Sequence, residues 1–93
     1  EDHLRQILDL MLRKESKLAA ERGLKLEFSA RAKQWMLDQN DHPEWGARPL
    51  RRIIRRYVRE PLADFLLKEN PEAGATIHIG AGKNGLTFKI NQN

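Results

Sequence analysis

The residue in this sequence whose type and setting most suggest chemistry is Arg48, in the run Gly46-Ala47-Arg48-Pro49-Leu50. Proline suits the first turn of a helix, where its missing N–H breaks no hydrogen bond, so Pro49 predicts a helix start. Proline also disfavours helical backbone in the residue before it. We therefore expect Arg48 to project from the N-terminal end of this helix and not along its length. Gly46 permits a close backbone approach, and Ala47 keeps the loop slim.

Such a position suits contact with an anion. The free N–H groups and the dipole of a helix N-terminus attract negative charge, and a guanidinium adds a fork that fits phosphate oxygens. The arrangement predicts a polyphosphate contact at Arg48. The alternative is a loop arginine paired with a nearby carboxylate. On spacing alone this second interpretation is the better one, because a short motif needs context to confirm it.

A second cluster of cations follows directly. Residues 47–60 have a local net charge of +5 within a chain of net charge +4, so the remainder is close to neutral. One interpretation is a solvated helix face, but such faces normally mix both signs, and like charges one turn apart repel. The other is contact with an acidic partner, either nucleic acid or a neighbouring protein surface, and the near absence of acid favours it. The arginines concerned are Arg51, Arg52, Arg55, Arg56 and Arg59.

The segment Gly80-Ala81-Gly82-Lys83-Asn84 has some likeness to a phosphate-binding loop. That motif needs a glycine where Ile77 stands and a Ser or Thr where Asn84 stands, and a helix should follow it. Here strand-like residues lie on both sides. The segment is therefore interpreted as a hairpin turn.

Metal and nucleophile chemistry find no support in the sequence. His3, His42 and His78 are scattered without ligand-like spacing, so we expect no metal site. No Ser/His/Asp or Cys/His arrangement stands out.

The elements that must position these residues follow from periodicity. Apolar residues recur at helical spacing over 3–22 and 30–39, and again from Pro49 to Asn70, where Pro61 predicts a kink or break near Arg59–Pro61. Residues 24–28, 75–79 and 86–90 are strand-like, the last two forming a hairpin. Gly23 is expected to end the first helix, and Ser29 to cap the second. The predicted fold class is α+β, an α-β-α-α-β-β domain whose three-stranded sheet carries its helices on one face.

Length and composition set the broad class. Ninety-three residues fit one domain, residues 1–93. The chain has no cysteine, which excludes a disulfide scaffold, and no apolar run approaches the ~20 residues that span a bilayer. The first residue is Glu1 and the start is acidic, so we expect no signal peptide and a piece of a longer protein. A cytoplasmic location without membrane contact is the matching expectation.

The run from Asp41 to Ile54, continued by Glu60-Pro61-Leu62-Ala63, resembles the C-terminal small (lid) domain of Clp-family AAA+ unfoldases of the ClpB, ClpC and ClpE types. The similarity spans essentially the whole chain, and Gly-Ala-Arg-Pro-Leu is its most specific part. The arginine-rich segment leans toward the ClpC and ClpE branches. Two departures bear on the branch: the family commonly has Asp at His42, and Tyr or Phe at Trp45.

The resemblance implies a lid that senses ATP in a protein-unfolding chaperone of protein quality control. Arg48 would be the sensor-2 arginine, with Gly46, Ala47 and Pro49 flanking the nucleotide and Ile7 near the adenine. The preceding large domain would hold ATP and Mg²⁺, so the chain alone is expected to be no enzyme. The lid would pack against its own large domain and against neighbouring subunits of a homo-hexamer, to which a partner protease could dock.

Two other functions stay open at this point. A basic module that binds nucleic acid through its arginine-rich helix is the alternative from a different class. A purely structural ring-assembly domain is the third, in which the arginine surface matters and Arg48 does not.

Overall fold

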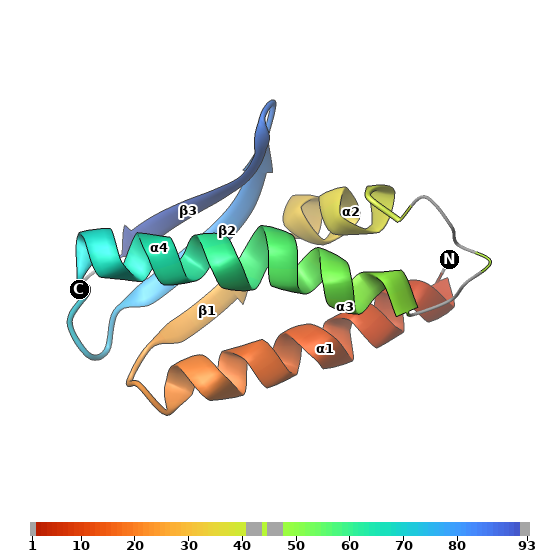
Figure 1. Ribbon diagram of the computed structural model, residues 1–93. Helices are drawn as coiled ribbons and strands as arrows, with labels where there is room; N and C mark the ends of the chain where they lie inside the picture. The colour runs from red at the N-terminus through yellow and green to blue at the C-terminus, as the bar shows by residue number, and fades with distance from the viewer. Residues whose placement is uncertain (1, 41–43, 45–47, 92–93) are drawn as a thin grey trace.

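The computed structural model describes residues 2–40, 44 and 48–91. Three helical segments and a three-stranded sheet form the domain (Figure 1), so the predicted fold class and order of elements are confirmed. A short π-helical turn, η2, lies between α3 and α4. The elements are α1 (Asp2–Ala20), β1 (Lys25–Phe28), α2 (Ala30–Asp38), α3 (Arg48–Ile54), η2 (Arg55–Arg59), α4 (Glu60–Glu69), β2 (Thr76–Gly82) and β3 (Gly85–Asn91).

The sheet has β2 at its centre. β1 pairs with it in parallel, and β3 pairs with it in antiparallel through the hairpin. A parallel pair needs a long crossover, and here the crossover carries α2, α3, η2 and α4. The tight turn at Lys83-Asn84 joins β2 to β3, with Gly82 paired to Gly85. The segment with some likeness to a phosphate-binding loop is thus a hairpin, as predicted.

Side chains alternate between the two faces of the sheet. Ile77 and Ile79 of β2 are buried, whereas His78 between them is exposed beside Glu27 and Lys89 on the flanking strands. The apolar face is the one that the helices cover (Figure 1), and the polar face is open. This is the one-sided packing that the sequence predicts.

The hydrophobic core lies between the helices and the sheet, and both contribute side chains to it. Burial of large apolar side chains is the main stabilising contribution in a domain of this size. Trp35 and Tyr57 make an edge-to-face contact at its margin, with ring centroids 5.0 Å apart. The largest fully buried side chains are Leu8, Met36, Leu50, Val58, Ile77 and Ile79.

Helix ends agree with the sequence predictions. Gly23 has a positive φ of 77° after α1, and Asn70 ends α4 in the left-handed region. The hydroxyl oxygen of Ser29 accepts a hydrogen bond from the N–H of Ala32 at 3.0 Å, which caps α2.

Replacing Ser29 with Ala is expected to destabilise the domain by about 1 kcal/mol, because an N–H in the first turn of α2 loses its acceptor. Urea denaturation of the chain measures this free energy of unfolding. Ser16→Ala, within α1, is the matched control and should be neutral or slightly stabilising, since alanine favours helix. Equal stabilities of the two variants would contradict the capping role.

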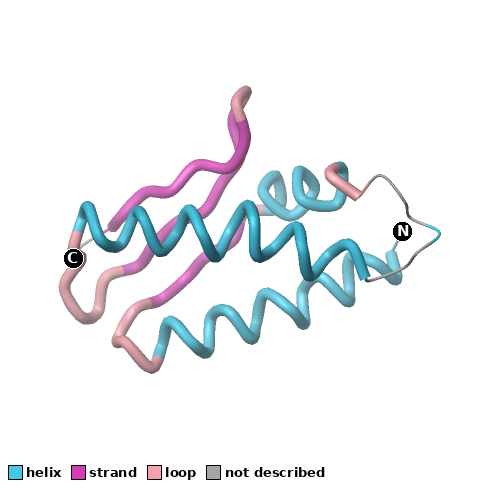
Figure 2. The backbone as a smooth tube through the Cα atoms, viewed as in Figure 1, coloured by secondary structure: helices cyan, strands magenta, loops and turns pink. Residues whose placement is uncertain are grey.

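The interruption predicted near Arg59–Pro61 is present, but as a π turn and not as a break: α3 ends at Ile54, η2 follows, and α4 begins at Glu60 with Pro61 in its first turn. Helical backbone runs continuously from Arg48 to Glu69 (Figure 2). The N–H of Glu60 donates to the carbonyl of Arg55, five residues back, which is the hydrogen bond of a π turn. Pro61 has no N–H to donate, and its ring would collide with the carbonyl four residues earlier in a regular α-helix. We attribute the wider turn to this collision, which the helix relieves locally and without ending.

Candidate functional site

Arg48 is the first residue of α3, and its side chain is exposed. The helix therefore begins one residue earlier than Pro49, where the sequence predicts its start. A proline in the first turn causes no clash, because no preceding turn lies behind it. Arg48 thus lies at the N-terminal end of the helix that carries the later arginines, one turn before Arg51 and Arg52, and only the expectation that its backbone is non-helical is wrong.

No carboxylate in the described part of the chain pairs with Arg48. The ion pairs found there join Lys33 to Asp9, Arg59 to Glu15 and His78 to Glu27. Within these residues, the alternative of an internally neutralised Arg48 therefore has no support. An exposed guanidinium at a helix N-terminus is chemically suited to phosphate oxygens.

Of the other residues predicted to lie near the nucleotide, the structure describes Pro49 and Ile7. Pro49 is half-buried in the first turn of α3. Ile7 lies in α1 and packs partly against the core. The N-terminal ends of α1 and α3 lie at the same end of the molecule (Figure 1), so the fold brings the segments of Ile7 and Arg48 to one side. Gly46 and Ala47 lie outside the described residues.

The arginines that follow divide into two groups. Arg51, Arg52, Arg55 and Arg56 are exposed, and the Arg56 guanidinium lies 5.6 Å from the centre of the Tyr57 ring. We call these four residues the arginine stripe. Arg59, which the sequence places with them, instead bonds within the domain.

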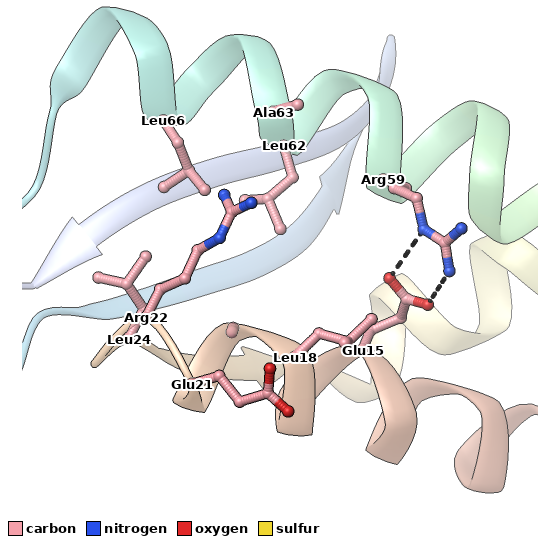
Figure 3. A pocket seen from close by; sticks show the side chains of 10 residues that line it. Glu15, Leu18, Glu21, Arg22, Leu24, Arg59, Leu62, Ala63 and Leu66 are labelled. Carbon is pink, nitrogen blue, oxygen red and sulfur yellow. Dashed lines mark hydrogen bonds and ion pairs between the residues drawn. The ribbon is translucent and has the colours of Figure 1, made fainter.

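Arg59 and Glu15 form a two-pronged ion pair between η2 and α1 (Figure 3). The Nε and Nη2 atoms of Arg59 donate to the two carboxylate oxygens at 3.3 and 2.6 Å. The Glu15 side chain is only 10% exposed, and that of Arg59 is 57% exposed. Hydrogen bonding to Glu15, and then its charge, raise the pKa of Arg59 above its usual value. The ion pair stabilises the fold while Arg59 is charged, and this stabilisation is lost only as the pH rises through the raised pKa. The guanidinium therefore stays charged under ordinary conditions.

The π turn explains why Arg59 leaves the stripe. In a regular helix, residues four apart share a face, which would align Arg51, Arg55 and Arg59. A π turn holds more residues than an α turn, so each residue advances by a smaller rotation about the helix axis. The Arg59 side chain is therefore rotated away from the face of Arg51 and Arg55 and contacts Glu15 of α1. The sequence does not indicate Glu15 as the partner of Arg59, because nothing in a residue's local pattern points to a residue 44 positions away.

A double-mutant cycle measures this pair. The coupling energy between Glu15→Gln and Arg59→Gln is expected to be about 0.5–1 kcal/mol, near the upper end for a solvent-screened pair, because the geometry is bidentate. Urea denaturation of the four proteins gives the value. The ion pair between Lys33 and Asp9 has one contact, of 3.1 Å. A second double-mutant cycle on this pair should give a smaller coupling energy. A larger coupling for Lys33–Asp9 would contradict this account.

The same pair closes one end of a shallow groove between α1 and α4 (Figure 3). The groove has a volume of about 310 Å³. Its floor is apolar and its rim carries charges of both signs, so it shows no preference for an anion or a cation. Its lining includes Leu18, Leu24, Leu62 and Leu66, with Glu21 and Arg22 at the rim.

Two structural features are absent from the described residues. None of their helices combines the length and apolar character needed to span a bilayer. Among the same residues, no three His, Cys, Asp or Glu side chains gather as metal ligands would.

Comparison with known proteins gives a consistent result. The family model of the C-terminal, D2-small domain of ClpB protein matches residues 1–79. The chain is 37% identical over 83 residues to the chaperone protein ClpB of Rhizobium meliloti (strain 1021), which covers 89% of this chain and 10% of that protein. It is 44% identical over 64 residues to the ATP-dependent Clp protease ATP-binding subunit ClpL of Lactococcus lactis subsp. lactis, covering 69% of this chain and 8% of that protein.

The ClpB protein of Aquifex aeolicus (strain VF5) is 38% identical over 76 residues, which cover 82% of this chain and 8% of that protein. The chain thus spans about a tenth of the length of the curated relatives it matches. Because the matching family model is that of ClpB, the comparisons do not support the leaning toward the ClpC and ClpE branches. They also give no support to the nucleic-acid alternative.

Proposed function

The chain belongs to the family of C-terminal D2-small domains of ClpB proteins, and from this we propose that it is the nucleotide-sensing lid of an ATP-dependent protein unfoldase. Arg48 is the sensing residue in this proposal. The observation that carries it is an exposed guanidinium at the start of α3 without a carboxylate partner among the described residues. A cation left unpaired at a helix N-terminus is available to a phosphate that another domain presents.

The helix behind Arg48 supplies the rigidity that a sensor needs. Leu50 is fully buried, and Ile53 and Ile54 are nearly so. These side chains fix α3 against α1 and α2, which it contacts. A change in the position of Arg48 therefore moves the whole domain and not a loose loop.

The sensing step follows from differential binding. ATP, when bound to the preceding large domain together with Mg²⁺, supplies γ-phosphate oxygens that ADP lacks. Arg48 donates hydrogen bonds to those oxygens, so the lid has one preferred orientation in the ATP state and another in the ADP state. The same guanidinium offsets negative charge that develops during phosphoryl transfer. Ile7, at the same end of the domain, is proposed to lie near the adenine.

The lid is also proposed to join subunits into a homo-hexameric ring, through contacts with its own large domain and with neighbouring subunits. The exposed arginine stripe is the part of this chain assigned to that contact. Arg59 is left out of the assignment, because it already bonds to Glu15.

Nucleotide titration of the chain alone tests the division of labour. Hydrogen bonds to a single charged group contribute about 1.5–3 kcal/mol, and a dissociation constant of 1 mM corresponds to about 4.1 kcal/mol. We therefore expect the 93-residue chain to bind ATP more weakly than about 1 mM in calorimetry and to hydrolyse none. Micromolar binding or measurable hydrolysis would contradict the proposal.

A further inference from the structure

We propose that the arginine stripe (Arg51, Arg52, Arg55 and Arg56) docks onto an acidic helix face of a neighbouring subunit, whose carboxylates are spaced one helical turn apart. The inference rests on the proposed ring contact and goes further, because it names the chemistry of the surface that the lid meets. It also removes Arg59 from the contact.

The charge of the stripe is not balanced within the domain. All four side chains are exposed, and no ion pair found among the described residues includes any of them. Each pair four residues apart (Arg51 with Arg55, Arg52 with Arg56) repels by a few tenths of a kcal/mol. A surface that gathers like charges at this cost and leaves them unpaired is complementary to an acidic one.

The stripe stands on a rigid support. On the opposite side of the same helical segment, Leu50 and Val58 are fully buried and Ile54 is 4% exposed. One stripe residue is also ordered by its neighbour, since the Arg56 guanidinium lies over the Tyr57 ring. Little backbone freedom remains to be lost on binding, which favours a specific contact.

The geometry of the stripe sets the spacing of its partner. Arg51 and Arg55 are four residues apart, which corresponds to about 6 Å along an α-helix. Glutamates four residues apart on a facing helix have the same repeat, and each carboxylate can take a guanidinium fork. The π turn ends the pattern there, because it directs the next cation, Arg59, onto Glu15 of α1.

An acidic protein fits better than nucleic acid. Binding to a nucleic-acid backbone gains from a basic groove that follows the strand and from aromatic side chains that stack on bases. The chain outside residues 47–60 is close to neutral. The ring of Tyr57 beside the stripe already contacts Trp35 edge to face and carries Arg56 above it.

The test uses a fluorescein-labelled, alanine-based helical peptide with glutamates every fourth residue, and fluorescence anisotropy with the 93-residue chain. We expect the peptide to bind, and to bind more weakly at about 200 mM than at about 50 mM salt. The double variant Arg51→Ala/Arg55→Ala should lower the affinity about tenfold or more. Alanine favours helix, so the variant is expected to stay folded, which circular dichroism checks.

Lys14→Ala/Lys17→Ala is the matched control, because it removes the same charge from exposed positions on α1 and should change the affinity less than about twofold. Failure of the peptide to bind, or an equal loss in both double variants, would overturn the proposal. Stronger binding of a single-stranded RNA of equal charge would assign the stripe to nucleic acid instead. No nucleotide is present in this assay, so its failure leaves the role of Arg48 to be judged separately.

Discussion

Replacing Arg48 with Ala in the full-length protein, which we propose to be an ATPase, is expected to lower ATP turnover by about 10- to 100-fold. Removing one preorganised donor from a developing oxyanion commonly costs two to three orders of magnitude in kcat. The expected loss is smaller here, because the large domain and Mg²⁺ are proposed to supply other stabilising contacts. Steady-state phosphate release measures the turnover, and substrate unfolding should fall with it.

Folding of the variant domain is expected to be unaffected, since Arg48 is exposed and bonds to no described residue in the domain. Arg22→Ala provides the matched control, because Arg22 is an exposed arginine near the opposite end of α1. The ATP turnover of this control should equal that of the unmodified full-length protein. An equal loss of ATP turnover in both variants would mean that the effect comes from the change in net charge and not from a sensing contact at Arg48.

Replacing Ile77 with Ala is expected to destabilise the domain by about 2–5 kcal/mol. Ile77 is fully buried on the central strand, where its side chain faces the helices. Truncation removes apolar burial and leaves a cavity that the surrounding side chains fill only in part. A domain of this length has a total stability of roughly 5–14 kcal/mol, so the variant should lie close to unfolding. Thermal and urea denaturation measure the loss.

Two neighbouring substitutions keep that prediction testable if the alanine variant does not fold. Ile77→Val removes one methylene group and should cost about 0.5–1.5 kcal/mol. His78→Ala changes the next residue, which lies on the open face. Its ion pair with Glu27 is solvent-exposed on both sides, so the variant should stay within about 0.5 kcal/mol of the unmodified chain. A His78 variant less stable than the Ile77→Val variant would contradict the assigned orientation of β2.

Periodicity and end signals were enough to predict the α-helices and strands that the structure describes, though not the π turn η2. The caps at Gly23, Ser29 and Asn70 are local, because each depends on the few residues around it. The alternation in β2 likewise predicts which face the helices cover. Since these signals are short-ranged, they can be interpreted without knowledge of the tertiary structure.

The features that the sequence did not predict depend on contact with a distant segment or on a choice between two conformations of similar free energy. Pro61 excludes a regular α turn, but a break and a π turn both satisfy it, and core packing on either side favours the continuous helix. The pairing of Arg59 with Glu15 follows from that choice and from the position of α1. The parallel pairing of β1 with β2 leaves no local signal either, because α2 and the helical run from Arg48 to Glu69 separate the two strands in sequence.

One prediction for Arg48 distinguishes nucleotide sensing from a nonspecific effect of its positive charge. If it senses the γ-phosphate, it must bind the ATP state better than the ADP state. The most direct measurement is the ratio of ATP to ADP affinity in the full-length protein under conditions that prevent hydrolysis. We predict that Arg48→Ala lowers this ratio about tenfold or more, in line with the loss of charged hydrogen bonds. An unchanged ratio would contradict the account.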